Sequence, residues 1–166
     1  MNLLEKLELG WRKLASELDG KQHAERKLLE ALQRDYQEET QLAEALKKQS
    51  EKVPYDHLRR KLLEIAEAEK RHAELLLEKI RELGGETPET ADQAHKDAAL
   101  TTLDLLKILE EEKEEYAEYL NARALAKEAE REDIRQLLER IREEEALHRK
   151  ELLDIVSRLN PLPIDR

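Results

Sequence analysis

The sequence predicts an all-α protein organised as a four-helix bundle, and three observations carry that prediction. Of the 166 residues, 42% are charged, whereas only four are glycine and four are proline. Apolar residues recur at steps of three and four along nearly the whole chain, which is the pattern of amphipathic helices. One turn-rich stretch, GGETPETADQAHKD, separates two pairs of such segments and is long enough to connect opposite ends of a bundle.

The chain begins with a short amphipathic helix, which we expect over residues 1–20. Glycine is a natural helix stop, and Gly20 follows the apolar stripe directly. Acidic and basic residues nearly balance in this segment, whereas helices that lie on membranes usually carry a basic face. A helix that docks on protein is therefore expected. Its stripe consists of Leu4, Leu7, Trp11, Leu14 and Leu18.

Residues 21–160 are predicted to hold four longer helices in two pairs. The first stops before Pro54 and the second follows it, because proline disrupts a helix interior. The second ends at the glycine pair that opens the turn-rich stretch. Pro161 closes the last helix and leaves a short tail at 161–166.

No glycine or proline separates the third helix from the fourth, but their apolar stripes are out of phase. A stripe continued from the third helix would bury acidic residues, whereas the apolar residues resume at Ile134. We therefore expect a break within residues 128–133. Asp133 and Gln136 have the spacing of a capping box, which marks a helix start.

Polar residues interrupt the stripes at mid-length. Glu69 and His72 do so in the second helix, and Glu145 and His148 at the same depth in the last, where the apolar neighbours match position for position. Residues three apart share a helix face, so each pair can direct a carboxylate and an imidazole at one point. The other two helices carry acids on their stripes: Asp35 and Glu39 on the first, and Glu112 on the third.

Burying several carboxylates together is costly unless a positive charge compensates them. Two divalent metals would do so, and a mixed set of carboxylates and imidazoles suits iron or manganese. The alternative is a metal-free bundle, because Glu-x-x-His arises by chance in a chain this rich in glutamate. Two copies in phase with the stripe, opposed by acids on the other helices, favour the metal site.

These residues resemble the ferritin-like di-iron carboxylate superfamily, particularly its rubrerythrin and bacterioferritin branches, over about residues 25–159. The strongest matches are LLEIAEAEKRHAELLLEKIRELGG and LLERIREEEALHRKELL, which look like the family's second and fourth helices. The resemblance implies a ferritin-like four-helix bundle with a long crossover between the second and third bundle helices. The N-terminal helix would be an addition to that fold.

The resemblance also implies a set of ligands. Glu69 and Glu145 would bridge two metals, and His72 and His148 would be terminal ligands. On the third helix the family has a glutamate seven residues before a tyrosine, which selects the ligand and its partner there. These are Glu112 and Tyr119, with Glu115 as an additional ligand.

The ligand on the first helix stays open between two residues. The family usually has Glu-Tyr there, whereas this chain has Asp35 followed by Tyr36. Aspartate is one methylene shorter, so either Asp35 reaches the metal or Glu39, one turn away on the same stripe, replaces it.

The activity implied by the resemblance is oxidation of Fe(II) by O2 or H2O2 at a pair of iron ions, with manganese as another metal. Tyr119 is the candidate catalytic residue, because a tyrosine near the metals can hydrogen-bond a ligand or carry an electron. Tyr36 and Tyr116 could act in the same way, but Tyr36 is better explained as a large helix residue with a polar tip. The alternatives are dimanganese catalase chemistry, an oxygenase, and a metal-free scaffold that docks a partner through its N-terminal helix.

Composition also bears on the partners and cofactors that the protein could use. The net charge of −10 argues against a nucleic-acid partner, and the chain has no cysteine for an iron–sulfur cluster. Reducing equivalents would then come from an external electron donor or from Fe(II) itself. The only methionine is Met1, which argues against a methionine-ligated haem. Without a long apolar run or a secretory leader, we expect a cytoplasmic protein away from membranes. We also expect it to form a homo-oligomer, a dimer.

Overall fold

Each segment with an apolar three- and four-residue repeat forms a helix in the computed structural model, which describes residues 3–89 and 102–159. Within these residues, side chains are described except at 3–8, 102–104 and 111–116. The helices are α1 (Leu3–Lys52), α2 (Asp56–Glu82), α3 (Thr102–Glu128) and α4 (Glu132–Leu159). No strand occurs in the described ranges.

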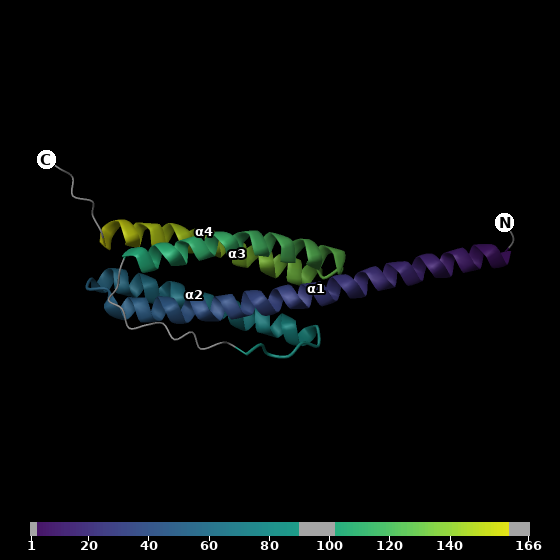
Figure 1. Ribbon diagram of the computed structural model, residues 1–166, viewed down its shortest axis with the longest axis horizontal. Helices are drawn as coiled ribbons and strands as arrows, with labels where there is room; N and C mark the ends of the chain where they lie inside the picture. The colour runs from purple at the N-terminus through teal and green to yellow at the C-terminus, as the bar shows by residue number, and fades with distance from the viewer. Residues whose placement is uncertain (1–2, 90–101, 160–166) are drawn as a thin grey trace.

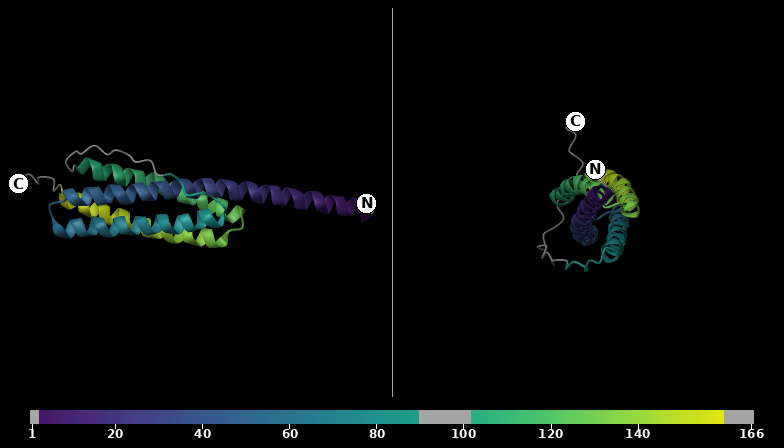
Figure 2. Two further views of the ribbon diagram at one scale, coloured as in Figure 1. Left: turned by 90° about the horizontal axis from the view of Figure 1, so that it is seen from below. Right: turned by 90° about the vertical axis from the view of Figure 1, so that its right-hand side faces the viewer.

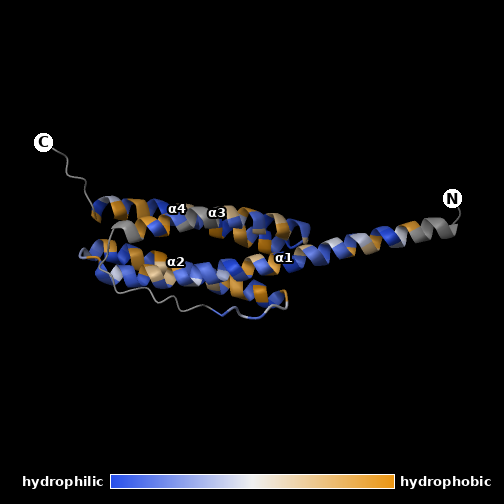
Figure 3. Ribbon diagram, viewed as in Figure 1, coloured by the Kyte–Doolittle hydropathy of each residue, from blue (hydrophilic) through white to orange (hydrophobic). Residues whose placement is uncertain are grey.

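The helices pack lengthwise in two pairs, as Figures 1 and 2 show. α1 packs against α2, α3 packs against α4, and α1 also contacts α3. Apolar and polar residues alternate along each helix (Figure 3), as expected of helices that bury one face. The sequence therefore predicted the four-helix bundle correctly.

The core has two apolar clusters with a polar layer between them. One cluster contains Leu28 and Leu32 of α1 together with Leu76 and Ile80 of α2. The other contains residues on the far side of the polar interruptions in the same helices, and Leu152 of α4. The polar layer is thus closed above and below by side chains that exclude water.

The predicted helix end at Gly20 is wrong, because α1 continues through it to Lys52. Glycine inside a helix costs only about 1 kcal/mol relative to alanine, which helix contacts on either side can offset. In Figure 1 the N-terminal part of α1 projects beyond the bundle, and residues 9–20 are all exposed. Trp11, 69% exposed, therefore does not pack on the chain's own bundle.

The break between α3 and α4 is confirmed, and a Schellman turn makes it. Glu130 adopts φ 56°, the N–H of Glu130 donates to the carbonyl of Lys127, and the N–H of Arg131 donates to the carbonyl of Ala126. α2 ends in the same way around Gly84, which has φ 78°. At the end of α3, Glu130 holds the position that glycine usually occupies.

The capping box predicted at Asp133 and Gln136 is not formed. α4 begins at Glu132, one residue before the predicted cap, so Asp133 lies inside the helix. The Asp133 carboxylate accepts hydrogen bonds from Arg131 and Lys79, and Gln136 donates to Glu132. Charged groups of the preceding turn, of α2 and of α4 itself bind these side chains, which spacing alone does not reveal.

None of the helices in the described part of the chain combines the length and the apolar character that crossing a membrane requires.

Two adjacent leucines on α2 test the core assignment. Leu76 is fully buried, whereas Leu75 is 41% exposed. We expect Leu76→Ala to lower the free energy of unfolding by about 2–5 kcal/mol, because it removes buried methyl groups and leaves a cavity. Leu75→Ala should cost less than about 1 kcal/mol. Urea denaturation of the two variants checks this, and equal losses would contradict the placement of the core.

Candidate metal centre

The polar layer brings together side chains from three helices. Glu39 of α1, Glu69 and His72 of α2, and Glu145 of α4 each offer one ligand atom, and these atoms lie within 4.8 Å of one another. All four side chains are buried. Each belongs to the polar interruptions identified in the sequence.

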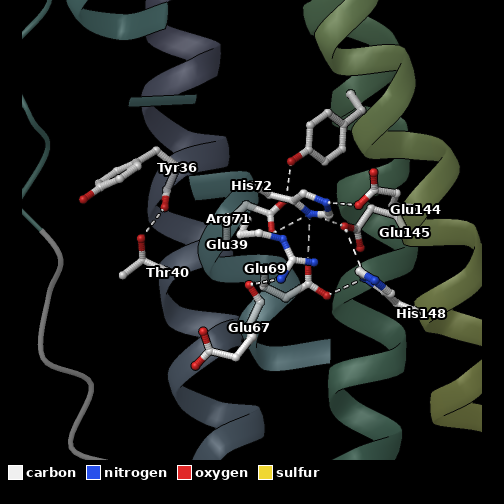
Figure 4. Close-up of polar contacts among 11 residues, drawn as sticks. Tyr36, Glu39, Thr40, Glu67, Glu69, Arg71, His72, Glu144, Glu145 and His148 are labelled. Atoms are coloured by element: carbon white, nitrogen blue, oxygen red, sulfur yellow. Dashed lines mark hydrogen bonds and ion pairs between the residues drawn. The ribbon is translucent and has the colours of Figure 1, made fainter. Parts of the chain in front are cut away.

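His72 stands at the centre of this cluster, as Figure 4 shows. Its Nδ1 lies 2.9 Å from Oε1 of Glu145 and 3.0 Å from Oε2 of Glu69. Oε2 of Glu39 is farther from the same nitrogen, at 3.8 Å. One imidazole nitrogen therefore faces three carboxylates from three helices.

His148 of α4 completes the arrangement on the other side of Glu69. Its Nδ1 lies 2.8 Å from Oε1 of Glu69 and 3.8 Å from Oε1 of Glu145. The rings of His148 and His72 are roughly stacked, with centroids 5.7 Å apart. Each oxygen of Glu69 thus faces a different imidazole, and Glu145 also lies between the two rings.

In spite of these close contacts, every carboxylate oxygen of the cluster except Oε1 of Glu39 lacks a hydrogen-bond donor among the described residues. Among the described residues, none donates a well-aligned hydrogen bond to either oxygen of Glu69 or Glu145, to Oε2 of Glu39, or to Nδ1 of either histidine. Buried polar atoms of native proteins are nearly always paired. Such unpaired atoms, all aimed at one small region, fit a site whose partner is a metal.

Burial and the mutual charges of the cluster shift the pKa values of its members. Burial by itself would lower the pKa of His72, but the surrounding carboxylates, Glu145 first among them, raise it well above its ordinary value of 6.5. Burial raises the pKa of Glu145 to about 7 and that of Glu39 well above 4.5. Burial also acts to raise the pKa of Glu69, but the two imidazoles lower it to about 2.

Of the two candidate metal ligands on α1, Glu39 lies in this cluster and Asp35 does not. Both side chains are buried on the same stripe, but four residues correspond to about 6 Å along a helix. Asp35 instead groups with Glu38 and with Glu118 of α3. Burial, with Glu38 and Glu118, raises the pKa of Asp35 to about 8.

Tyr119 of α3 contacts the cluster through Glu39. Its hydroxyl donates a short hydrogen bond to Oε1 of Glu39, and the side chain is 2% exposed. Burial, followed by the charge of Glu39, raises the pKa of Tyr119 well above 10, so the tyrosine keeps its proton. Tyr36 points away from the cluster in Figure 4.

Three predicted residues of α3 lie outside the described side chains. Glu112, Glu115 and Tyr116 belong to the helix, but only its backbone is described there. Their predicted roles stay predictions.

Sequence analysis missed Glu144. Its Oε2 lies 3.0 Å from Nε2 of His72, so the second nitrogen of that ring also faces a carboxylate. Glu144 is half exposed and lies off the apolar stripe. No periodicity in the sequence could separate it from the other surface glutamates of this charged chain, since only the packing of α4 against α2 places it.

Comparison with known proteins gives a family and a fold. A rubrerythrin family model matches residues 28–156. Bacterioferritin of Desulfovibrio desulfuricans, whose diiron site has been captured in different catalytic states, is similar with a TM-score of 0.76 and 24% identity, over 87% of this chain and 86% of that chain. A Xanthomonas campestris protein gives a TM-score of 0.73 and 17% identity over 82% and 92%. No curated protein matches.

The two solved structures, at these identities, bear on the fold alone. They confirm the ferritin-like helical bundle that the sequence predicted. The family match spans well over half of the chain, and together with the buried cluster of glutamate and histidine it supports a di-iron site. The chain therefore belongs to the rubrerythrin family.

Proposed function

We propose that this chain binds two iron ions in the polar layer and oxidises Fe(II) with O2 or H2O2. The observation that carries the proposal is the convergence of Glu39, Glu69, Glu145 and His72, with buried oxygens that lack hydrogen-bond donors among the described residues. Membership of the rubrerythrin family supports it. So does the similarity in fold to a bacterioferritin that has a diiron site.

The positions of the described side chains support a set of ligand roles. Glu69 and Glu145 lie between the two imidazoles, which is the position of a carboxylate shared by two metals. His72 and His148 would be terminal ligands. Glu39 would be the terminal carboxylate from α1. Glu112 and Glu115 of α3 would be ligands on the strength of the resemblance alone.

The orientation of His72 suggests which nitrogen binds metal. Nδ1 faces the three carboxylates, and Nε2 faces Glu144. A neutral imidazole would then use Nδ1 as ligand and keep its proton on Nε2, where Glu144 accepts it. Carboxylates beyond the ligands commonly fix the ring of a metal-binding histidine in this way.

The reaction needs electrons, which bound iron supplies to the oxidant. The chain's residues hold and shield the site: apolar clusters on both sides exclude water, and the Tyr119 hydroxyl orients Glu39. Without cysteine, the chain would draw reducing equivalents from an external donor protein or from Fe(II) as the substrate. The cytoplasmic dimer expected from the sequence stays a prediction.

Metal stoichiometry and Fe(II) oxidation test the central cluster. We expect the purified chain to bind at least two Fe(II) per chain under anaerobic conditions and to oxidise them faster than iron in buffer. Glu69→Gln should abolish the accelerated oxidation, because it removes the carboxylate between the imidazoles. Glu67→Gln, an exposed neighbour on the same helix, should leave it unchanged.

The alternatives have their own outcomes in the same experiment. No bound metal after expression in iron- and manganese-supplemented medium, with no thermal shift on adding either, would favour the metal-free scaffold. Disproportionation of H2O2 to O2 and water by a manganese-loaded chain would favour dimanganese catalase chemistry.

Metal binding should release protons. At neutral pH the metal-free chain keeps a proton on His72, and Glu145 is partly protonated because its pKa is about 7. Metal ligands must lose these protons, so affinity should rise as pH increases through 7. Calorimetry of Mn(II) binding in buffers of different ionisation enthalpy measures the protons released. A pH-independent affinity would contradict this account of the cluster.

Tyr119→Phe tests the role of the tyrosine. Loss of its hydrogen bond to Glu39 should slow Fe(II) oxidation by about 10–100-fold, the usual effect of removing a partner that orients a metal ligand. Tyr36→Phe is the matched control, because Tyr36 points away from the cluster (Figure 4). Stopped-flow absorbance measures both rates, and equal rates for the two variants would refute the role of Tyr119.

A further inference from the structure

We propose that Asp35, Glu38 and Glu118 form a second cation site, separate from the central cluster, which binds a hard divalent ion such as Mn(II) or Fe(II). These residues are called the outer cluster below. Asp35 and Glu38 are three residues apart on α1 and share a face, and Glu118 meets them from α3. One carboxylate oxygen from each lies within 4.8 Å of the others.

The burial of Asp35 also supports a cation site in the outer cluster. Its side chain is 2% exposed, and its Oδ2 has no hydrogen-bond partner among the described residues. Oε2 of Glu118 is buried and lacks a hydrogen bond in the same way. A buried carboxylate oxygen without a donor is destabilising, so a fold that keeps one next to two further carboxylates needs a compensating charge.

The guanidinium of Arg34 reaches only part of the outer cluster. Nε of Arg34 lies 3.8 Å from Oε2 of Glu118, and the Arg34 side chain is 53% exposed. At that distance and exposure the ion pair is weak. It leaves Oδ2 of Asp35 without a hydrogen-bond donor.

The donor set indicates which ions would bind. The outer cluster offers carboxylate oxygens only, which suit hard divalent ions, whereas the central cluster adds imidazoles. Glu38 and Glu118 are only partly buried. An ion held there can therefore keep some of its water and can enter from solvent without crossing the apolar core.

The outer cluster and the central cluster involve neighbouring residues of the same two helices. Glu38 and Glu39 are adjacent on α1, and Glu118 and Tyr119 are adjacent on α3. The first residue of each pair belongs to the outer cluster, whereas Glu39 belongs to the central cluster and receives the hydrogen bond of Tyr119. The outer cluster is thus next to the central one but shares no ligand with it.

Binding of Mn(II), followed by electron paramagnetic resonance of the free ion, tests the proposal without relying on activity. In a chain whose central cluster is disabled by Glu69→Gln and Glu145→Gln, we expect one Mn(II) to remain bound. Adding Asp35→Asn and Glu118→Gln should weaken that binding at least tenfold. The same two changes in the wild-type chain should remove one equivalent and leave the central metals in place.

The matched control is Glu44→Gln with Glu110→Gln, which removes the same charge from exposed positions of the same two helices. It should leave the remaining Mn(II) bound. The proposal is overturned if the chain with the disabled central cluster binds no Mn(II), as it would if a proton alone neutralised Asp35. It is also overturned if the outer-cluster changes weaken binding no more than the control does. The proposal can be tested even if the central cluster binds no metal, because Mn(II) binding to the outer cluster is measured in a chain whose central cluster is disabled.

Discussion

The burial of several carboxylates in the middle of the bundle is the constraint on which the rest of this structure depends. Glu39, Glu69 and Glu145 approach one imidazole nitrogen from three helices, in a layer closed by apolar clusters on both sides. Such a layer is stable only with positive charge inside it. The surrounding carboxylates raise the pKa of His72, which favours its charged form, and bound metal ions would supply positive charge in its place. The bundle supplies the rigidity that keeps the carboxylates together against their repulsion.

Helix geometry explains how a chain this polar builds the layer. On α2 and on α4, a glutamate and a histidine three residues apart share the face that carries the buried leucines and isoleucines. The apolar neighbours fix the depth and rotation of that face, so the polar pairs are carried into the core. The two pairs are not equivalent, because His72 is 3% exposed and meets Glu144, whereas His148 is 12% exposed.

Where prediction from the sequence failed, competing local and tertiary interactions were of similar size. Gly20 does not end α1, because one glycine costs too little to break a long helix. Asp133 does not cap α4, because Arg131 and Lys79 bind its carboxylate instead. Local signals of about 1 kcal/mol thus give way to neighbouring turns or charged partners. The apolar stripes within the bundle, which sum many buried side chains, were predicted correctly where their side chains are described, whereas the stripe at the N-terminal end of α1 is exposed.

The sequence by itself determined the helices of the bundle, their inward faces and the Glu-x-x-His pairs, because these follow from periodicity along one helix. It left Asp35 and Glu39 equivalent, since both lie on the same stripe. Only the tertiary structure separates their positions: the axial level of α1 against α2 and α4 brings Glu39 to His72 and leaves Asp35 with Glu38 and Glu118. The contacts of Glu144 with His72 and of Tyr119 with Glu39 likewise depend on how helices pack, which no single-helix pattern encodes.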